Sequence, residues 1–325
     1  MNLTYSLRLA CICLASFFLV QAVFAAIVGL AARGAIRAAG GLAPRFAALF
    51  LFAIRMTPLF LAAFLVFGLC VPSYLLLEPS STGEQVGWPC VVTALLGAAT
   101  CFGSALRVIL AGERSRKYRK ACGKAGSQSS LGRNSVPATI VSEHGPLLAV
   151  AGILRSKLIV SSNVLQALSA DELDVALLHE RAHRIWRDNF KRLLFLAAPR
   201  GLAHSSGLRA IERQWSKFSE WAADDFAAAG DPRKALSLAA ALIRIARLGS
   251  AAPQPAIVSS FVQSEDLSER VERLLCATPS PDRFSTKMRA LIGGAALTFS
   301  FLLAGAILWP ASLSAVHYLL ERLID

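Results

Sequence analysis

The sequence predicts a polytopic α-helical membrane protein that carries one soluble α+β domain. Of its 325 residues, 55% are hydrophobic and only 17% are charged. The apolar residues are concentrated in four long blocks with almost no charge, a pattern typical of membrane-spanning helices. The stretch between the third and fourth blocks, residues 112–288, is the only part polar enough to fold in water.

Four transmembrane helices are therefore expected. The first three lie in residues 1–111, and the fourth lies in residues 289–325, where it is followed by a short outer tail. The predicted spans are 9–32, 57–77, 88–111 and about 290–320.

The basic residues predict the orientation of these helices. Arg33, Arg37 and Arg45 belong to an expected loop after the first helix, and the cluster ERSRKYRK follows the third. The segment 78–87 contains two glutamates and no basic residue. Because cytoplasmic loops are enriched in Lys and Arg, we expect the N-terminus outside and residues 112–288 in the cytoplasm. The same bias accounts for the net charge of +13 without nucleic acid, since basic and aromatic residues are not interleaved.

The soluble part begins with a polar linker, residues 122–135, and continues with three short apolar runs that predict a small antiparallel sheet. Residues 169–198 are expected to form one long helix, which Ser169 and Glu172 start as a capping box. Further helices are expected at about 207–229, from Asp231 to near Gly249, and in SEDLSERVERLLCA.

The long helix contains the most informative motif, LLHERAHRIWRD. His179 and His183 are four residues apart, so both imidazoles face the same way and can bind one metal ion. Glu180 can then take a proton from a water molecule on that ion. Glu220, on the next helix, is the best candidate for a third ligand. Asp224 lies one turn further and fits the role of orienting a ligand histidine, with Asp225 as a less well-phased alternative.

Other interpretations of these residues stay open. A helix rich in Arg and Glu can match the HExxH pattern by chance, although the following ExxxD favours a metal. Asp188 is either a surface partner of Arg184 or Arg192 or a catalytic group. The seven cysteines include no CxxC pair and predict neither a disulfide framework nor a metal site.

Taken together, these residues resemble the BlaR/MecR-type membrane zinc metallopeptidases. The resemblance is carried by GILRSKLIVSSNVLQALSADELDVALLHERAHRIWRDN, EWAADDFA, LSERVERLL and the three-plus-one order of the membrane helices. It implies a zincin-like domain with Zn²⁺ bound by His179, His183 and Glu220, Glu180 as general base and acid, and Asp224 orienting a ligand. The best-known members continue into an outer sensor domain, whereas only a short tail is expected here.

The resemblance implies a metalloendopeptidase in a bacterial inner membrane that acts in regulatory or signalling proteolysis. Its expected partners are the lipid bilayer and a protein substrate, either a cytoplasmic regulator or a membrane-anchored protein, and a homodimer is possible. Two alternatives remain: a non-catalytic sensor or scaffold with a structural zinc site, and a quality-control membrane protease.

Overall fold

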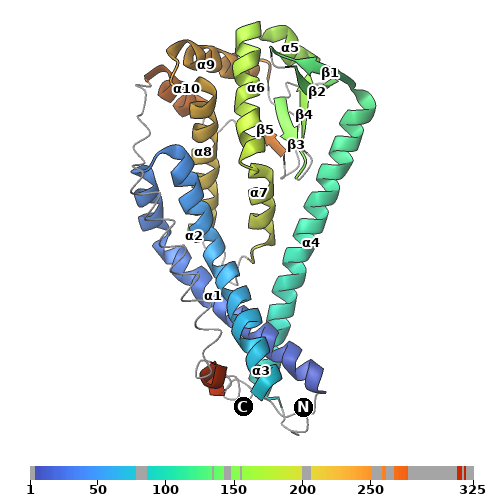
Figure 1. The fold of residues 1–325 in the computed structure, drawn as a ribbon, viewed down its shortest axis with the longest axis vertical. Coiled ribbons are helices and arrows are strands. Elements are labelled where there is room, and N and C mark those ends of the chain that lie inside the picture. Colours follow the sequence, from blue (N-terminus) through green and yellow to red (C-terminus); the bar gives the residue numbers. More distant parts are fainter. Residues whose placement is uncertain are drawn as a thin grey trace.

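A computed structural model describes most of the chain as three long helices joined to a small α+β domain (Figure 1). The helices converge at the end where α1 begins, and the domain occupies the opposite end. The described residues are 4–77, 86–133, 135–142, 148–153, 156–199, 206–249, 258–260, 267–276, 313–316 and 318–319.

Within the part of the chain that the structure describes, three helical segments are long and apolar enough to cross a membrane. The first is α1 (Tyr5–Gly40) and the third is α4 (Trp88–Ala125). The second is continuous through α2 (Pro44–Phe64), a π-helical segment η1 (Leu65–Cys70) and α3 (Val71–Leu77). They contain the predicted spans 9–32, 57–77 and 88–111, and with 36, 34 and 38 residues they exceed the roughly 20 that a bilayer requires.

The expected arginine-containing loop after the first span is wrong. Helix α1 continues to Gly40 and α2 begins at Pro44, so Arg33 and Arg37 are helical and only three residues connect the two helices. Alanine and arginine favour helix, and proline is well suited to the first helical position. The predicted fourth span lies outside the described residues except for 313–316 and 318–319, which are helical.

A mixed five-stranded sheet with the order β1-β2-β4-β3-β5 forms one side of the domain. Its strands are β1 (Ser127–Leu131), β2 (Val136–Val141), β3 (Leu148–Ala151), β4 (Lys157–Ser161) and β5 (Val258–Ser260).

The prediction of an antiparallel sheet is wrong at one pairing, because β4 lies between β2 and β3 and runs parallel to β2. Strand β1 comes from the segment that was expected to be a linker. Its sequence SQSSL is largely exposed and has no apolar alternation, so its pairing with β2 could not be predicted from periodicity.

Six helices complete the domain, and those predicted after residue 206 are confirmed within a few residues. They are α5 (Ser162–Ala167), α6 (Ala170–Ile185), α7 (Asp188–Ala197), α8 (Ser206–Ala228), α9 (Pro232–Arg247) and α10 (Leu267–Cys276). The capping box is present, since the Ser169 hydroxyl accepts from the Glu172 N–H and the Glu172 carboxylate accepts from the Ser169 N–H.

The single long helix predicted over 169–198 is wrong, because the chain breaks between α6 and α7. Arg187 adopts the left-handed conformation, with φ 55° and ψ 44°. The break allows the buried Asn189 to reach the sheet, where its amide donates to the carbonyls of Val150 and Gly152 at 2.9 and 3.0 Å. These two bonds connect the start of α7 to the end of β3.

Two apolar cores hold the site between them. One lies between the sheet, α6 and α9, and includes Val160, Val175 and Leu242. The other joins α1 and α2 to α7 and α8, which lie between that pair of helices and α4 (Figure 1). Beside this second core Gly207 of α8 lies so close to α1 that an added Cβ would clash with the carbonyl oxygen of Gly29.

Candidate metal centre

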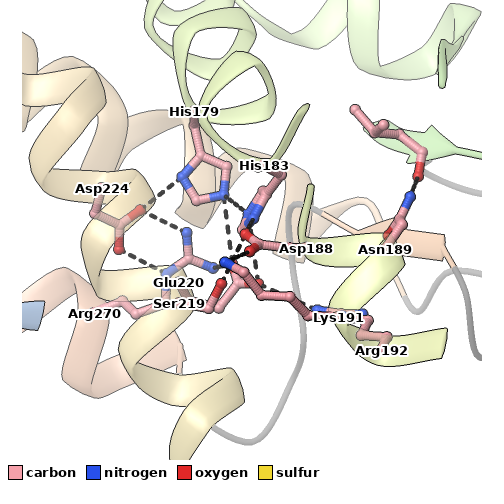
Figure 2. A network of polar contacts seen from close by, with 11 residues as sticks. His179, His183, Asp188, Asn189, Lys191, Arg192, Ser219, Glu220, Asp224 and Arg270 are labelled. Atoms are coloured by element: carbon pink, nitrogen blue, oxygen red, sulfur yellow. Dashed lines mark hydrogen bonds and ion pairs between the residues drawn. The ribbon is translucent and has the colours of Figure 1, made fainter. Parts of the chain in front are cut away.

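Helices α6 and α8 pack together and bring the predicted ligands to one point (Figure 2). His179 and His183 project from α6, and Glu220 projects from α8. All three side chains are buried and offer donor atoms within 4.8 Å of one another. The group could therefore hold a metal ion.

The spacing of the donor atoms fits a tetrahedral ion. The two histidine Nε2 atoms are 3.1 Å apart, and the Glu220 oxygens lie 3.4 Å from His179 Nε2 and 3.6 Å from His183 Nε2. Bonds of 2.0–2.1 Å around tetrahedral zinc separate neighbouring ligands by about 3.3 Å. Each of the three residues could thus contribute a donor atom to one ion of this kind.

Each histidine is oriented by a carboxylate at its other nitrogen (Figure 2). Asp224 lies 3.0 Å from Nδ1 of His179, and Asp188 lies 2.8 Å from Nδ1 of His183. A proton held at Nδ1 leaves the lone pair at Nε2, where a metal would bind. Asp188 also accepts from the Ser219 hydroxyl at 2.9 Å and from Lys191 at 2.8 Å.

Arg270 of α10 binds two of the carboxylates from the far side. Its Nε and Nη2 donate to both oxygens of Asp224 at 2.9 and 2.7 Å, and its Nη1 lies 3.3 Å from Glu220. The guanidinium is buried. Burial alone would raise the pKa of Asp224, but the charge of Arg270 and the bonds from Arg270 and His179 lower it to about 2.

Glu180 lies beside the ligand group and has a different environment. Its side chain is buried, and neither carboxylate oxygen has a hydrogen-bond partner among the described residues. Removal from water raises the pKa of Glu180 to about 7, against the opposing charges of His183 and His179. It also lines an open cavity of about 460 Å³, so it can meet a ligand that enters from solvent.

The raised pKa of His183 shows that the carboxylates around it stabilise a positive charge. Burial alone would lower the pKa of His183, but the Glu220 charge and the Asp188 hydrogen bond raise it to about 10. Burial would raise the pKa of Glu220, and the charges and hydrogen bonds of the histidines hold it well below its usual value. Without a metal, a proton on His183 supplies the positive charge that these carboxylates stabilise.

The sequence of this chain matches no family model and no curated protein. The interpretation of the site therefore depends on the chain's own residues and their geometry.

The structure brings together His179, His183, Glu220 and Asp224, as the sequence predicted (Figure 2). The fifth predicted residue, Glu180, lies close enough to interact electrostatically with both histidines and with Glu220. Asp225 instead pairs with Arg273 on the outer side of α8.

Two further residues contribute to the site. Asp188, for which the sequence left a surface ion pair and a catalytic role open, is buried against His183 and is no surface partner of Arg184 or Arg192. Arg270 was missed, and it is 46 residues away from Asp224 in the chain. In the sequence, Arg270 was noted only as part of the stretch LSERVERLL, and no role was predicted for it.

Proposed function

We propose that the protein is a membrane-embedded, zinc-dependent metalloendopeptidase that cleaves a protein substrate in regulatory or signalling proteolysis. The observation that carries this proposal is the buried group of possible ligands, His179, His183 and Glu220, next to Glu180. Glu180 also faces the open cavity. A structural zinc site has no need of a buried, unpartnered carboxylate beside it.

The residues present fit a zinc ion. His179, His183 and Glu220 would hold it, and Asp224 and Asp188 would keep the imidazoles in the metal-binding tautomer. When bound, zinc supplies a Lewis acid that polarises a carbonyl and lowers the pKa of water to about 7.

Glu180 would move the protons of the reaction. Its carboxylate accepts a proton from the attacking water as the oxygen bonds to the peptide carbonyl carbon, and it then donates that proton to the leaving nitrogen as the C–N bond breaks. A pKa raised to about 7 by burial suits a group that must both accept and donate near neutral pH.

The proposed location of the domain is based on the apolar helices and on the distribution of basic residues between them. Three helices are long and apolar enough to cross a membrane. With a fourth span at about 290–320, the zincin-like domain in residues 112–288 would lie in the cytoplasm of a bacterial cell, at the inner membrane.

Replacement of Glu180 by Gln tests the reaction. We expect Glu180→Gln to lose peptide cleavage by at least a hundredfold while its zinc content stays equal to the wild type, because the ligands are unchanged. Glu113→Gln, which removes an exposed carboxylate on α4, is the matched control and should retain activity. Cleavage of a peptide library and metal analysis of the same samples provide the two readouts.

Activity retained by Glu180→Gln would refute the proposed role. If zinc is bound but even the wild type cleaves no peptide, the alternative of a non-catalytic sensor with a structural zinc site is favoured instead.

A further inference from the structure

The open cavity beside Glu180 has one wall made by α6 and another made by the sheet. The α6 wall presents Leu177, Glu180, Arg181 and Arg184, which share one face because residues three, four and seven apart lie above one another on a helix. Strands β2 and β4 contribute the opposite, largely apolar wall, which includes Val136 and Leu158. A ligand in this cavity therefore meets two guanidinium groups next to the proposed base.

The turn between β1 and β2 fixes the sheet wall to α6. The Arg133 backbone N–H donates to Asp174 at 2.9 Å, and its side chain binds Asp174 and Asp171. Gly132 packs so closely that an added Cβ would be 2.6 Å from the Asp174 carboxylate. The cavity thus lies between two firmly connected elements.

The acidic residues at the start of α6 are already paired and are not available to the cavity arginines. Asp171 and Asp174 bind Arg133, and Glu172 binds the Ser169 N–H and Arg244. Arg181 and Arg184 are exposed, and neither forms an ion pair with an acidic side chain in the described part of the chain. Among the described residues that line the cavity, Glu180 is the only acidic one, and its exposure is 1%.

Arginines on a helix surface are often simply solvated, but these two share a cavity with the proposed general base. Guanidinium groups bind carboxylates through paired, charge-assisted hydrogen bonds. We propose that Arg181 and Arg184 bind a substrate carboxylate, so that the preferred peptide carries an acidic side chain or a free C-terminal carboxylate next to the bond that is cleaved. This inference rests on the proposed peptidase function and names the class of its substrate.

Peptide binding to the Glu180→Gln protein tests the proposal without any cleavage. The probes are fluorescent, amidated alanine-based octapeptides with one Glu at each position in turn, together with their Gln analogues. A third set has Gln and a free C-terminal carboxylate, which separates the two sources of the negative charge. We expect at least one carboxylate peptide to bind roughly tenfold tighter than its neutral analogue, with the difference reduced in high salt.

Two variants made in the Glu180→Gln background locate the preference. Arg181→Gln with Arg184→Gln should reduce the difference between carboxylate and neutral peptides to less than twofold. Arg233→Gln with Lys234→Gln removes the same two charges from exposed positions on α9 and should leave the difference unchanged. Reversing the charges with Arg181→Glu and Arg184→Glu should favour Lys-containing peptides, and equal unfolding temperatures would show that all variants fold.

Equal binding of carboxylate and neutral peptides, or a preference that survives Arg181→Gln with Arg184→Gln, would overturn the inference. Absence of cleavage by the wild-type protein would refute the peptidase function and leave the binding result standing. A wild-type enzyme that cleaves neutral and acidic peptides equally well would keep the peptidase function and refute the carboxylate site.

Discussion

His179 and His183 each use Nδ1 to contact an aspartate, and this leaves both Nε2 atoms turned toward Glu220. In the metal-free protein a proton occupies Nε2 of His183. Burial alone would lower the pKa of His183, but Glu220 and Asp188 raise it to about 10. Metal and proton therefore compete for one lone pair.

This competition predicts how metal affinity depends on pH. A group whose pKa is raised to about 10 keeps its proton at neutral pH, so zinc must displace it and the affinity should increase as the pH rises. Between pH 7 and 8 we expect the affinity for zinc to increase about tenfold per pH unit. Below pH 7 the slope should steepen, because Glu180, whose pKa is about 7, is then also protonated. Competition with a chromophoric chelator measures the slope, and an affinity independent of pH would contradict it.

Arg270 should be essential for the stability of the site. Arg270→Gln leaves Asp224 and Glu220 buried without their cation, so we expect the free energy of unfolding to fall by about 3–5 kcal/mol. Arg273→Gln is the matched control, because Arg273 lies one turn away on α10 and pairs with Asp225 in a partly exposed ion pair. Its loss should cost less than about 1 kcal/mol. Chemical denaturation of the solubilised protein compares the two, and equal costs would refute the role of Arg270.

The five predicted site residues could be found from the sequence because their geometry is local. His179 and His183 follow from helix periodicity, and so do Glu220 and Asp224. Asp188 could not be placed, because five residues along an unbroken helix would turn it about 140° away from His183. The left-handed Arg187 brings it back. Arg270 depends on the packing of α10 against α8, which no local pattern encodes.

At the scale of elements, breaks and turns decide the shape of the site more than the helices do. The turn from β1 to β2 contacts α6 through Gly132, whose φ is +69°, and the break at Arg187 separates α6 from α7. Both are short backbone features with left-handed residues, and the sequence predicted neither of them. Strand β1 was missed for a related reason, since SQSSL pairs through its backbone while its side chains face solvent.

Gly132→Ala should destabilise the domain more than an alanine at another left-handed glycine. An added Cβ would lie 2.6 Å from Asp174 Oδ1 and 2.7 Å from Leu177 Cδ1, in addition to the backbone strain. Gly230 is the control, because its φ of +75° imposes the same strain and no described atom lies within 4 Å of its added Cβ. We expect the free energy of unfolding to fall by about 1–2 kcal/mol in Gly230→Ala and by about 1–3 kcal/mol more in Gly132→Ala. Equal losses measured by thermal unfolding would show that the turn can move away from α6.

On the scale of the whole molecule, the long apolar helices also form the frame of the α+β domain. Helix α8 packs against α1 and α2, and a buried Arg55 on α2 binds Glu212 on α8 at 2.8 Å. The sequence predicted where the apolar spans lie, because their composition is unmistakable. Their full length was not predicted, since the turns outside the predicted spans are polar or mixed and resemble loops in a hydropathy profile.

The expected orientation can be tested with a native cysteine. Cys276 on α10 is exposed, and we predict that it faces the cytoplasm, because the basic residues after the first and third spans favour that side. In a protein that retains Cys276 alone, a membrane-impermeant maleimide should label it only after the cells are opened. A single cysteine at Ser80, between the second and third spans, should be labelled in intact cells. The opposite pattern would reverse the topology.

Helix α4 runs for 38 residues, about 57 Å, and joins the sheet almost directly. Only Gly126 separates it from β1, and an added Cβ there would be 2.5 Å from the Ile140 carbonyl oxygen, so the junction is tightly packed and leaves little room for a hinge. A tilt of about 5° around the membrane end of such a rod displaces its far end by about 5 Å. If the apolar part of α4 crosses a membrane, as we propose, the helix would act as a lever arm. A small tilt of that part would then displace the strands that form one wall of the cavity.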